Sequence, residues 1–121
     1  MKESIVKEKT KAFAIRIIRM YQYLTKDAEH NEYVLSKQIL RSGTSIGANV
    51  REALRGQSRP DFHAKMNIAL KEACETEYWL ELLKETDYIT DESYQSMHDD
   101  CLEIIKMLTK IVKSTTPSTK L

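Results

Sequence analysis

The stretch RSGTSIGANVREALRGQSRP, residues 41–60, holds all three glycines of a chain of 121 residues. Gly43 and Gly47 lie four residues apart among other small residues. Each glycine costs a helix up to about 1 kcal/mol relative to alanine, so a loop is one possible structure for this segment. However, apolar residues keep the helical period on both sides of the glycines, from Ile39 to Val50. We therefore predict that Gly43 and Gly47 lie inside a helix, where they allow another helix to approach closely.

The end of the same stretch marks a turn into a further helix. Gly56 follows the last apolar residue of the period, as a C-cap glycine does. Ser58 and Asp61 have the spacing of a capping box, and Pro60 is tolerated in the first turn of a helix. The sequence therefore predicts a short connection between two antiparallel helices, centred near Ser58.

Apolar residues recur at helical spacing along nearly the whole chain, with a polar break at residues 25–33 and a capping threonine at Thr90. This pattern predicts an all-α fold, an antiparallel up-down-up-down four-helix bundle over residues 1–113, followed by a disordered tail over residues 114–121. The first helix is expected from about Ser4 to Leu24. The inward residues are expected to be Phe13, Ile17, Met20 and Leu24; Leu35, Ile39, Ser42, Ile46, Val50 and Ala53; Phe62, Met66, Ala69, Ala73, Thr76, Leu80 and Leu83; and Tyr94, Met97, Cys101, Ile104, Leu108 and Ile111.

Two of the expected helices carry more apolar surface than one core stripe needs. A bundle of this kind keeps apolar surface after its own core has closed, which predicts a homo-oligomer. The extra residues are Ile15, Ile18 and Tyr21 in the first helix, and Tyr78, Trp79 and Leu82 in the third.

The composition, 41% hydrophobic and 31% charged, is that of a soluble helical protein. No apolar run is long enough to cross a bilayer, and the N-terminal segment lacks a signal-peptide core, so we expect a cytoplasmic protein without a membrane partner. Cys74 and Cys101 have neither CxxC nor zinc-type spacing and are expected to be free thiols.

The net charge of +1 hides an asymmetry between the two halves of the chain. Residues 1–60 hold twelve Lys/Arg against six Asp/Glu, whereas residues 61–121 hold seven against twelve. Salt bridges within the fold or between copies would neutralise the two halves, and an exposed basic face would instead attract an anionic partner. The candidate contacts to nucleic acid or to a partner are Arg16, Arg19, Lys37, Arg51, Arg55 and Arg59.

A polar stripe runs beside the apolar stripe of the second helix and consists of Arg41, Ser45, Asn49 and Glu52, with Glu72 and Glu75 opposite. A turn near Ser58 places Glu52 near Lys65, and Arg41 near Glu75 or Glu77. Ferritin-like di-iron bundles need Glu-x-x-His pairs on two helices, and this sequence has none. We therefore interpret the stripe as ion pairs that fix the helix register, and we expect no metal and no cofactor.

Catalytic motifs are also missing from the sequence. It contains no nucleophile elbow, no phosphate-binding glycine loop and no histidine–acid constellation, so no enzyme is predicted.

A long segment of the chain resembles the bacterial four-helix-bundle family of 23S rRNA intervening-sequence proteins. The resemblance is sharpest in RSGTSIGAN (residues 41–49), ALKEA (69–73) and ETEYWL (75–80), and it extends from Phe13 to EIIKMLTKIV near the end. It implies a ring-like homo-oligomer, typically a pentamer, and no established enzyme activity. Relatives include the accessory variability determinant of diversity-generating retroelements, a basic bundle that binds a reverse transcriptase and nucleic acid.

The chain departs from the family pattern after Asn49, where Arg51 and Arg55 replace residues that are usually Glu and Gly. Two hypotheses follow. The first is a non-enzymatic oligomeric scaffold with a protein partner. The second is a nucleic-acid-binding accessory protein that uses the basic first and second helices.

Overall fold

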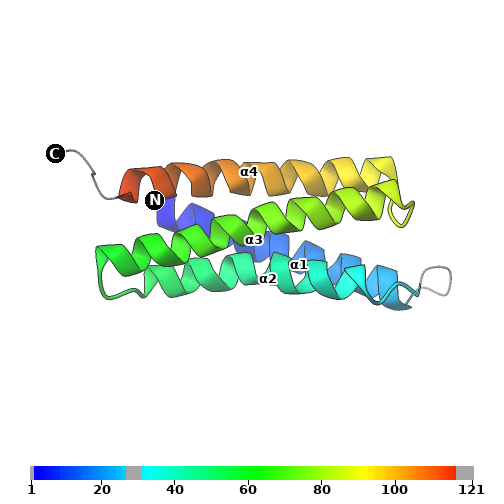
Figure 1. The fold of residues 1–121 in the computed structure, drawn as a ribbon, viewed down its shortest axis with the longest axis horizontal. Helices are drawn as coiled ribbons and strands as arrows, with labels where there is room; N and C mark the ends of the chain where they lie inside the picture. The colour runs from blue at the N-terminus through cyan, green and yellow to red at the C-terminus, as the bar shows by residue number, and fades with distance from the viewer. Residues whose placement is uncertain (1, 27–30, 117–121) are drawn as a thin grey trace.

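The computed structural model describes residues 2–26 and 31–116 and forms a four-helix bundle (Figure 1). The helices are α1 (Lys2–Lys26), α2 (Leu35–Leu54), α3 (Arg59–Glu85) and α4 (Asp91–Thr115). Consecutive helices run in opposite directions, so the predicted all-α, up-down-up-down bundle is confirmed. The start of α1, the end of α4 and the α2–α3 turn lie at one end of the bundle, and the α3–α4 turn lies at the other (Figure 1).

Three helices begin at side chains that accept hydrogen bonds from free backbone N–H groups. Ser58 accepts a bond from the N–H of Asp61 at 3.1 Å, and Thr90 accepts one from the N–H of Ser93 at 3.0 Å, as predicted. The start of α2 was not predicted. There the carboxylate of buried Glu32 accepts bonds from the N–H groups of residues 34, 35 and 36, at 3.1, 3.0 and 2.7 Å.

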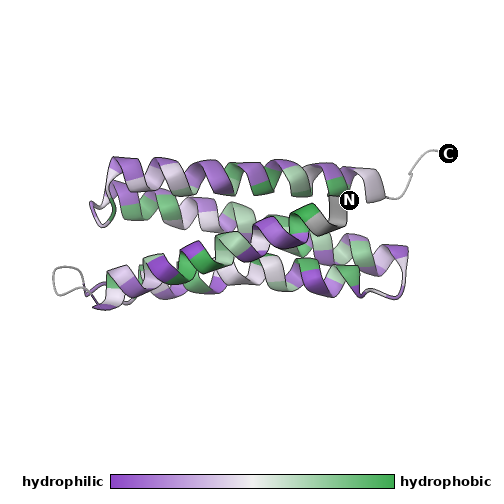
Figure 2. Cartoon of the chain, turned by 180° about the vertical axis from the view of Figure 1, so that it is seen from behind, coloured by the Kyte–Doolittle hydropathy of each residue, from purple (hydrophilic) through white to green (hydrophobic). Residues whose placement is uncertain are grey.

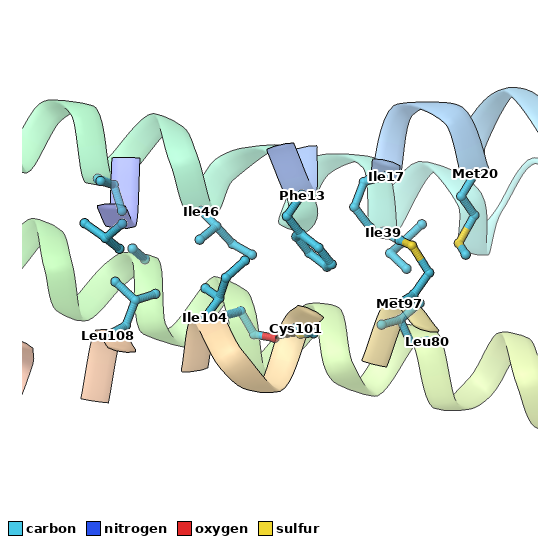
Figure 3. Packing of buried hydrophobic residues seen from close by; sticks show 14 of the residues in the cluster. Phe13, Ile17, Met20, Ile39, Ile46, Leu80, Met97, Cys101, Ile104 and Leu108 are labelled. Carbon is cyan, nitrogen blue, oxygen red and sulfur yellow. Dashed lines mark hydrogen bonds between the residues drawn. The ribbon is translucent and has the colours of Figure 1, made fainter. Parts of the chain in front are cut away.

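The predicted inward stripes meet in one hydrophobic core (Figure 3). On one side of the core, Phe13 and Ile17 of α1 lie beside Ile39 and Ile46 of α2. Ile104 of α4 lies on the opposite side. Among the expected core residues, only Leu35, Phe62, Tyr94 and Ile111 are partly exposed, and all four lie near helix ends. The helical period therefore identified the core correctly.

Gly43 and Gly47 lie on the side of α2 that faces α1. A Cβ atom on Gly43 would lie 2.7 Å from Cγ1 of Ile17, and one on Gly47 would lie 3.4 Å from the carbonyl oxygen of Thr10. Both glycines are buried inside α2, as predicted. At Gly43 even the smallest side chain would collide with α1, whereas at Gly47 it would make an ordinary contact, so the space for a side chain is missing at Gly43 alone.

Two predicted helix ends differ from the structure. No glycine in the described residues has a positive φ, so Gly56 does not end α2 in the left-handed conformation that favours glycine. A Cβ on Gly56 would lie 2.6 Å from a carboxylate oxygen of Asp61, which could move away, and 3.0 Å from the backbone carbonyl oxygen of Ala53. Helix α4 continues through Ser114 to Thr115, two residues beyond the predicted end at residue 113, and residues 117–121 of the expected disordered tail lie outside the described residues.

Among the pairs of helices that pack together, α1 and α4 have the least extensive contact. Two salt bridges connect them. The Nζ atom of Lys9 lies 2.9 Å from a carboxylate oxygen of Glu103, and Arg16 Nη1 lies 2.6 Å from that of Asp100. Figure 2 shows α1 crossing the bundle obliquely, with hydrophobic residues on its outward side. No helix in the described part of the chain combines the length and the apolar character needed to span a membrane.

Candidate functional site

Three of the six candidate basic residues form an exposed row along α2. Lys37, Arg51 and Arg55, the last at the C-cap, are all exposed, and their spacing places them on one side of the helix, away from the core. Within residues 2–26 and 31–116, none of the three forms an ion pair. We call these residues the α2 basic row.

The other three candidates are engaged with neighbouring groups. Arg16 donates to the carboxylate of Asp100 and, through Nη2, to the hydroxyl of Ser96 at 2.9 Å. Arg19 donates to Gln22 on its own helix at 3.3 Å, and Arg59 donates to the carbonyl oxygen of Ser114 at 3.2 Å. Arg16 and Arg59 therefore connect α4 to α1 and to α3.

Three of the candidate residues, Arg51, Arg55 and Arg59, lie four residues apart in the sequence, but the turn between α2 and α3 divides them. Arg51 and Arg55 precede the turn and face outward from α2, whereas Arg59 begins α3 and contacts the last turn of α4. The regular four-residue spacing in the sequence therefore does not produce one continuous surface, because a helix period holds only within one helix.

The predicted polar stripe joins α2 to α3. Arg41 pairs with Glu75 and, at 3.4 Å, with Glu72, and Lys65 pairs with Glu52 at 2.9 Å. The register prediction is confirmed for both pairs, with Glu75 and not Glu77 as the partner of Arg41. The hydrogen bond from Lys65 to Glu52 raises the pKa of Lys65.

The two small members of the stripe bond within their own helix. Ser45 donates to the carbonyl oxygen of Arg41 at 2.6 Å, and Asn49 donates to that of Ser45 at 2.9 Å. Glu77 lies on the other side of α3 and contacts His98 at 2.8 Å. Among the described residues, no group of three or more His, Cys, Asp or Glu is placed to hold a metal ion.

Charges of opposite sign gather at the two ends of the bundle. Around the α3–α4 turn, the pKa of Tyr94 is raised, first by burial of its side chain. The negative charges of Glu81, Glu77 and Glu85 raise it further. This end also holds Asp87, Asp91 and Glu92, which together with the glutamates outnumber the cations there, Lys26, Lys37 and Lys84. At the opposite end, the basic residues are Lys7, Lys9, Arg51, Arg55, Arg59, Lys65, Lys106, Lys110 and Lys113, and they outnumber Glu8, Glu52, Asp61 and Glu103.

The basic end contains a pocket of about 640 Å³ that was not predicted. Three helices supply its walls: α1 through Ile5, α3 through its first turn, and α4 through its last turns. Antiparallel order brings these segments together, but the sequence shows no local signal for the pocket because its residues are far apart in the chain. The lining consists of Ile5, Ser58, Arg59, Phe62, Met107, Lys110, Ile111, Ser114 and Thr115.

Cys74 and Cys101 are free thiols, as predicted. Burial raises the pKa of Cys101 to about 12, and its Sγ atom contacts the carbonyl oxygen of Ala73 at 3.4 Å. Although the Cys74 residue is exposed overall, partial desolvation of its thiol raises its pKa, and the charge of Glu77 raises it further. Neither cysteine is an activated thiolate at neutral pH.

Comparisons with known proteins agree over almost the whole chain. A family model described as 23S rRNA-intervening sequence protein matches residues 2–110. The chain is also similar to a protein with unknown function from the S23 ribosomal protein family of Bacteroides thetaiotaomicron, known from a crystal structure. The two sequences are 57% identical, the match covers 93% of this chain and 99% of that chain, and the TM-score is 0.89. No curated protein matches the chain.

Proposed function

The chain belongs to the family of 23S rRNA-intervening sequence proteins, and from this premise we propose that it is a non-enzymatic homo-oligomeric scaffold that binds other proteins. The family assignment made from the sequence is thereby confirmed. The solved relative has unknown function, so the role proposed for this chain depends on its own surfaces.

The observation that carries the proposal is the apolar outer surface of α1 and α3. Ile15 and Ile18 expose 48% and 40% of their surface, and on α3 Ile68 and Tyr78 expose 40% and 54%. The core beneath is already closed by other residues of the same helices. Apolar surface in excess of the core favours burial between copies of the chain. A cyclic pentamer, as the sequence resemblance implies, would use two different patches of each copy.

The test is the mass of the assembly in solution, measured by light scattering after size-exclusion chromatography. The wild-type chain is expected to be larger than a monomer at micromolar concentration. Replacing Ile15 and Ile18 together by lysine should release smaller species, because two charges would then enter an apolar contact. The control is Ala48→Lys, which adds a charge at an exposed position on α2, outside the apolar surfaces of α1 and α3. A monomeric wild type would refute the proposal.

A second candidate function is non-specific binding of RNA or DNA. It is supported by the α2 basic row, whose three cations have no ion-pair partner within the described parts of the chain. Such cations can replace the counterions of a phosphate backbone. The row holds no aromatic side chain on which bases could stack, so any contact would be with the backbone.

The measurement is fluorescence anisotropy of labelled RNA and DNA across a salt series. Each lost phosphate contact reduces the slope of log K against log salt by about 0.9, so Arg51→Gln with Arg55→Gln should reduce it by about 2. Lys26→Gln, an exposed change at the other end of the bundle, should leave the slope unchanged. The absence of binding by the wild type at low salt would exclude this function and leave the scaffold.

A further inference from the structure

The pocket at the basic end combines an apolar floor with cations. Ile5, Phe62, Met107 and Ile111 supply the apolar surface, and Ile5 remains 48% exposed although the adjacent Val6 is fully buried. The volume of about 640 Å³ lies within the range of about 300–1,000 Å³ that is usual for small-molecule sites. The pocket is therefore large enough for a small organic ligand.

Two positive charges line the pocket, and no carboxylate of the described residues does. Arg59 donates one N–H group to the carbonyl oxygen of Ser114. Its guanidinium carries five N–H groups, so further donors remain for a ligand. Lys110 is exposed and forms no ion pair with any residue that the structure describes. The hydroxyl of Thr115 bonds to Nδ1 of His63 at 2.8 Å, which fixes the last turn of α4 against α3. The electrostatics of the pocket thus favour an anion.

We propose that this pocket binds a small organic anion with an apolar body, such as a medium-chain carboxylate. The hydrocarbon part would cover the side chains of Phe62, Met107 and Ile111, and the anionic group would lie at Arg59 and Lys110. A phosphate backbone would leave the apolar floor uncovered, and a neutral hydrocarbon would leave both cations without a partner. A medium-chain carboxylate covers the apolar side chains with its hydrocarbon part and pairs with the two cations through its carboxylate group. This inference does not depend on the scaffold or on nucleic-acid binding.

The test is calorimetric titration of the full-length protein, in its native assembly, with octanoate and with neutral 1-octanol. Octanoate should bind saturably and more tightly than octanol. Lys110→Gln should weaken octanoate about fivefold to tenfold and leave octanol unchanged, because it removes a charge and little apolar surface. The matched control is Lys106→Gln, one turn earlier on α4 and outside the pocket lining, which should change the affinity less than twofold.

A second variant, Met107→Trp, places bulk in the pocket and should abolish octanoate binding. Thermal melts and the mass of the assembly are measured for every variant, so that a loss of folding is recognised. The proposal is overturned if octanoate shows no saturable binding, or if octanol binds equally well and Lys110→Gln has no effect. It is also overturned if Met107→Trp dissociates the assembly, because a second copy of the chain would then occupy the pocket.

Discussion

Replacing Gly43 by alanine should destabilise the protein, whereas the same replacement at Gly47, one turn further along α2, should stabilise it. At Gly43 the new Cβ would lie 2.7 and 2.9 Å from Cγ1 and Cγ2 of Ile17, well inside the 3.5–4.0 Å at which carbon atoms attract. Ile17 is fully buried and β-branched, so it cannot rotate away, and α1 must move.

The expected sizes follow from two opposing effects. Overpacking a core costs about 1–3 kcal/mol, and alanine gains up to about 1 kcal/mol over glycine in a helix. With the full helix gain subtracted, the net loss for Gly43→Ala is up to about 2 kcal/mol, or up to roughly 8 °C in Tm for a domain of this size. At Gly47 the nearest atoms of Thr10 are 3.4 Å away, an ordinary contact, so the helix gain of about 0.5–1 kcal/mol should remain.

The assay is urea unfolding followed by circular dichroism, with the two alanine variants as controls for each other. A double-mutant cycle with Ile17→Ala tests the cause. Ile17→Ala alone leaves a cavity and costs about 2–5 kcal/mol, and Gly43→Ala should partly fill that cavity. The combined loss should thus be smaller than the sum by more than about 0.5 kcal/mol. If Gly43→Ala stabilised the protein as Gly47→Ala does, the close approach of α1 would be wrong.

Three further predictions concern buried polar groups. Glu32→Ala should cost about 1–3 kcal/mol in urea unfolding, because three N–H groups of α2 lose their acceptor, whereas Glu32→Gln keeps one oxygen and should cost less. A hydrogen bond of 2.8 Å joins the hydroxyls of Ser42 and Thr76 in the core, so Thr76→Val should cost about 1 kcal/mol, and combining it with Ser42→Ala should cost less than the sum of the two single changes. Burial raises the pKa of Cys101 from 9.0 to about 12, so its neutral thiol stabilises the fold fully below pH 9 and less as the pH rises toward 12. The stability advantage of the wild type over Cys101→Ala should shrink across that interval, and a constant difference would contradict the raised pKa.

The helices and their core could be predicted from the sequence because each depends on residues close together in the chain. The period from Ile39 to Val50 identified α2 in spite of its glycines, and Ser58 and Thr90 identified two helix starts. Glu32 was missed as the cap of α2. Glu32 lies two residues before the N-cap position of α2, Val34, where the preferences for N-cap residues do not apply, and only the folded chain shows its carboxylate reaching forward to three N–H groups.

The contacts of the candidate site residues were less predictable. The ion pair between Lys65 and Glu52 could be predicted from the position of the turn near Ser58. Residues equally far from a turn on either side lie next to each other in two antiparallel helices. Arg16 contacts Asp100, which is 84 residues away, and no local rule connects the two. The pocket is harder still, because its shape depends on how the side chains of Ile5, Phe62 and Met107 leave space where three helix ends meet.

The charge asymmetry between the two halves of the sequence has two consequences in the folded chain. Along the helix contacts it produces ion pairs, such as Arg41 with Glu75 and Arg16 with Asp100, which join basic helices to acidic ones. Among the charges without an ion-pair partner in the described residues, Arg51 and Lys110 lie at one end and Glu85 at the other, where Lys37 also lies. The two alternatives that the sequence left open are therefore not exclusive. Substitutions along the helix contacts should change the free energy of unfolding, and those at the basic end should change the binding of anions while leaving the fold intact, since unpaired surface charges contribute little to stability.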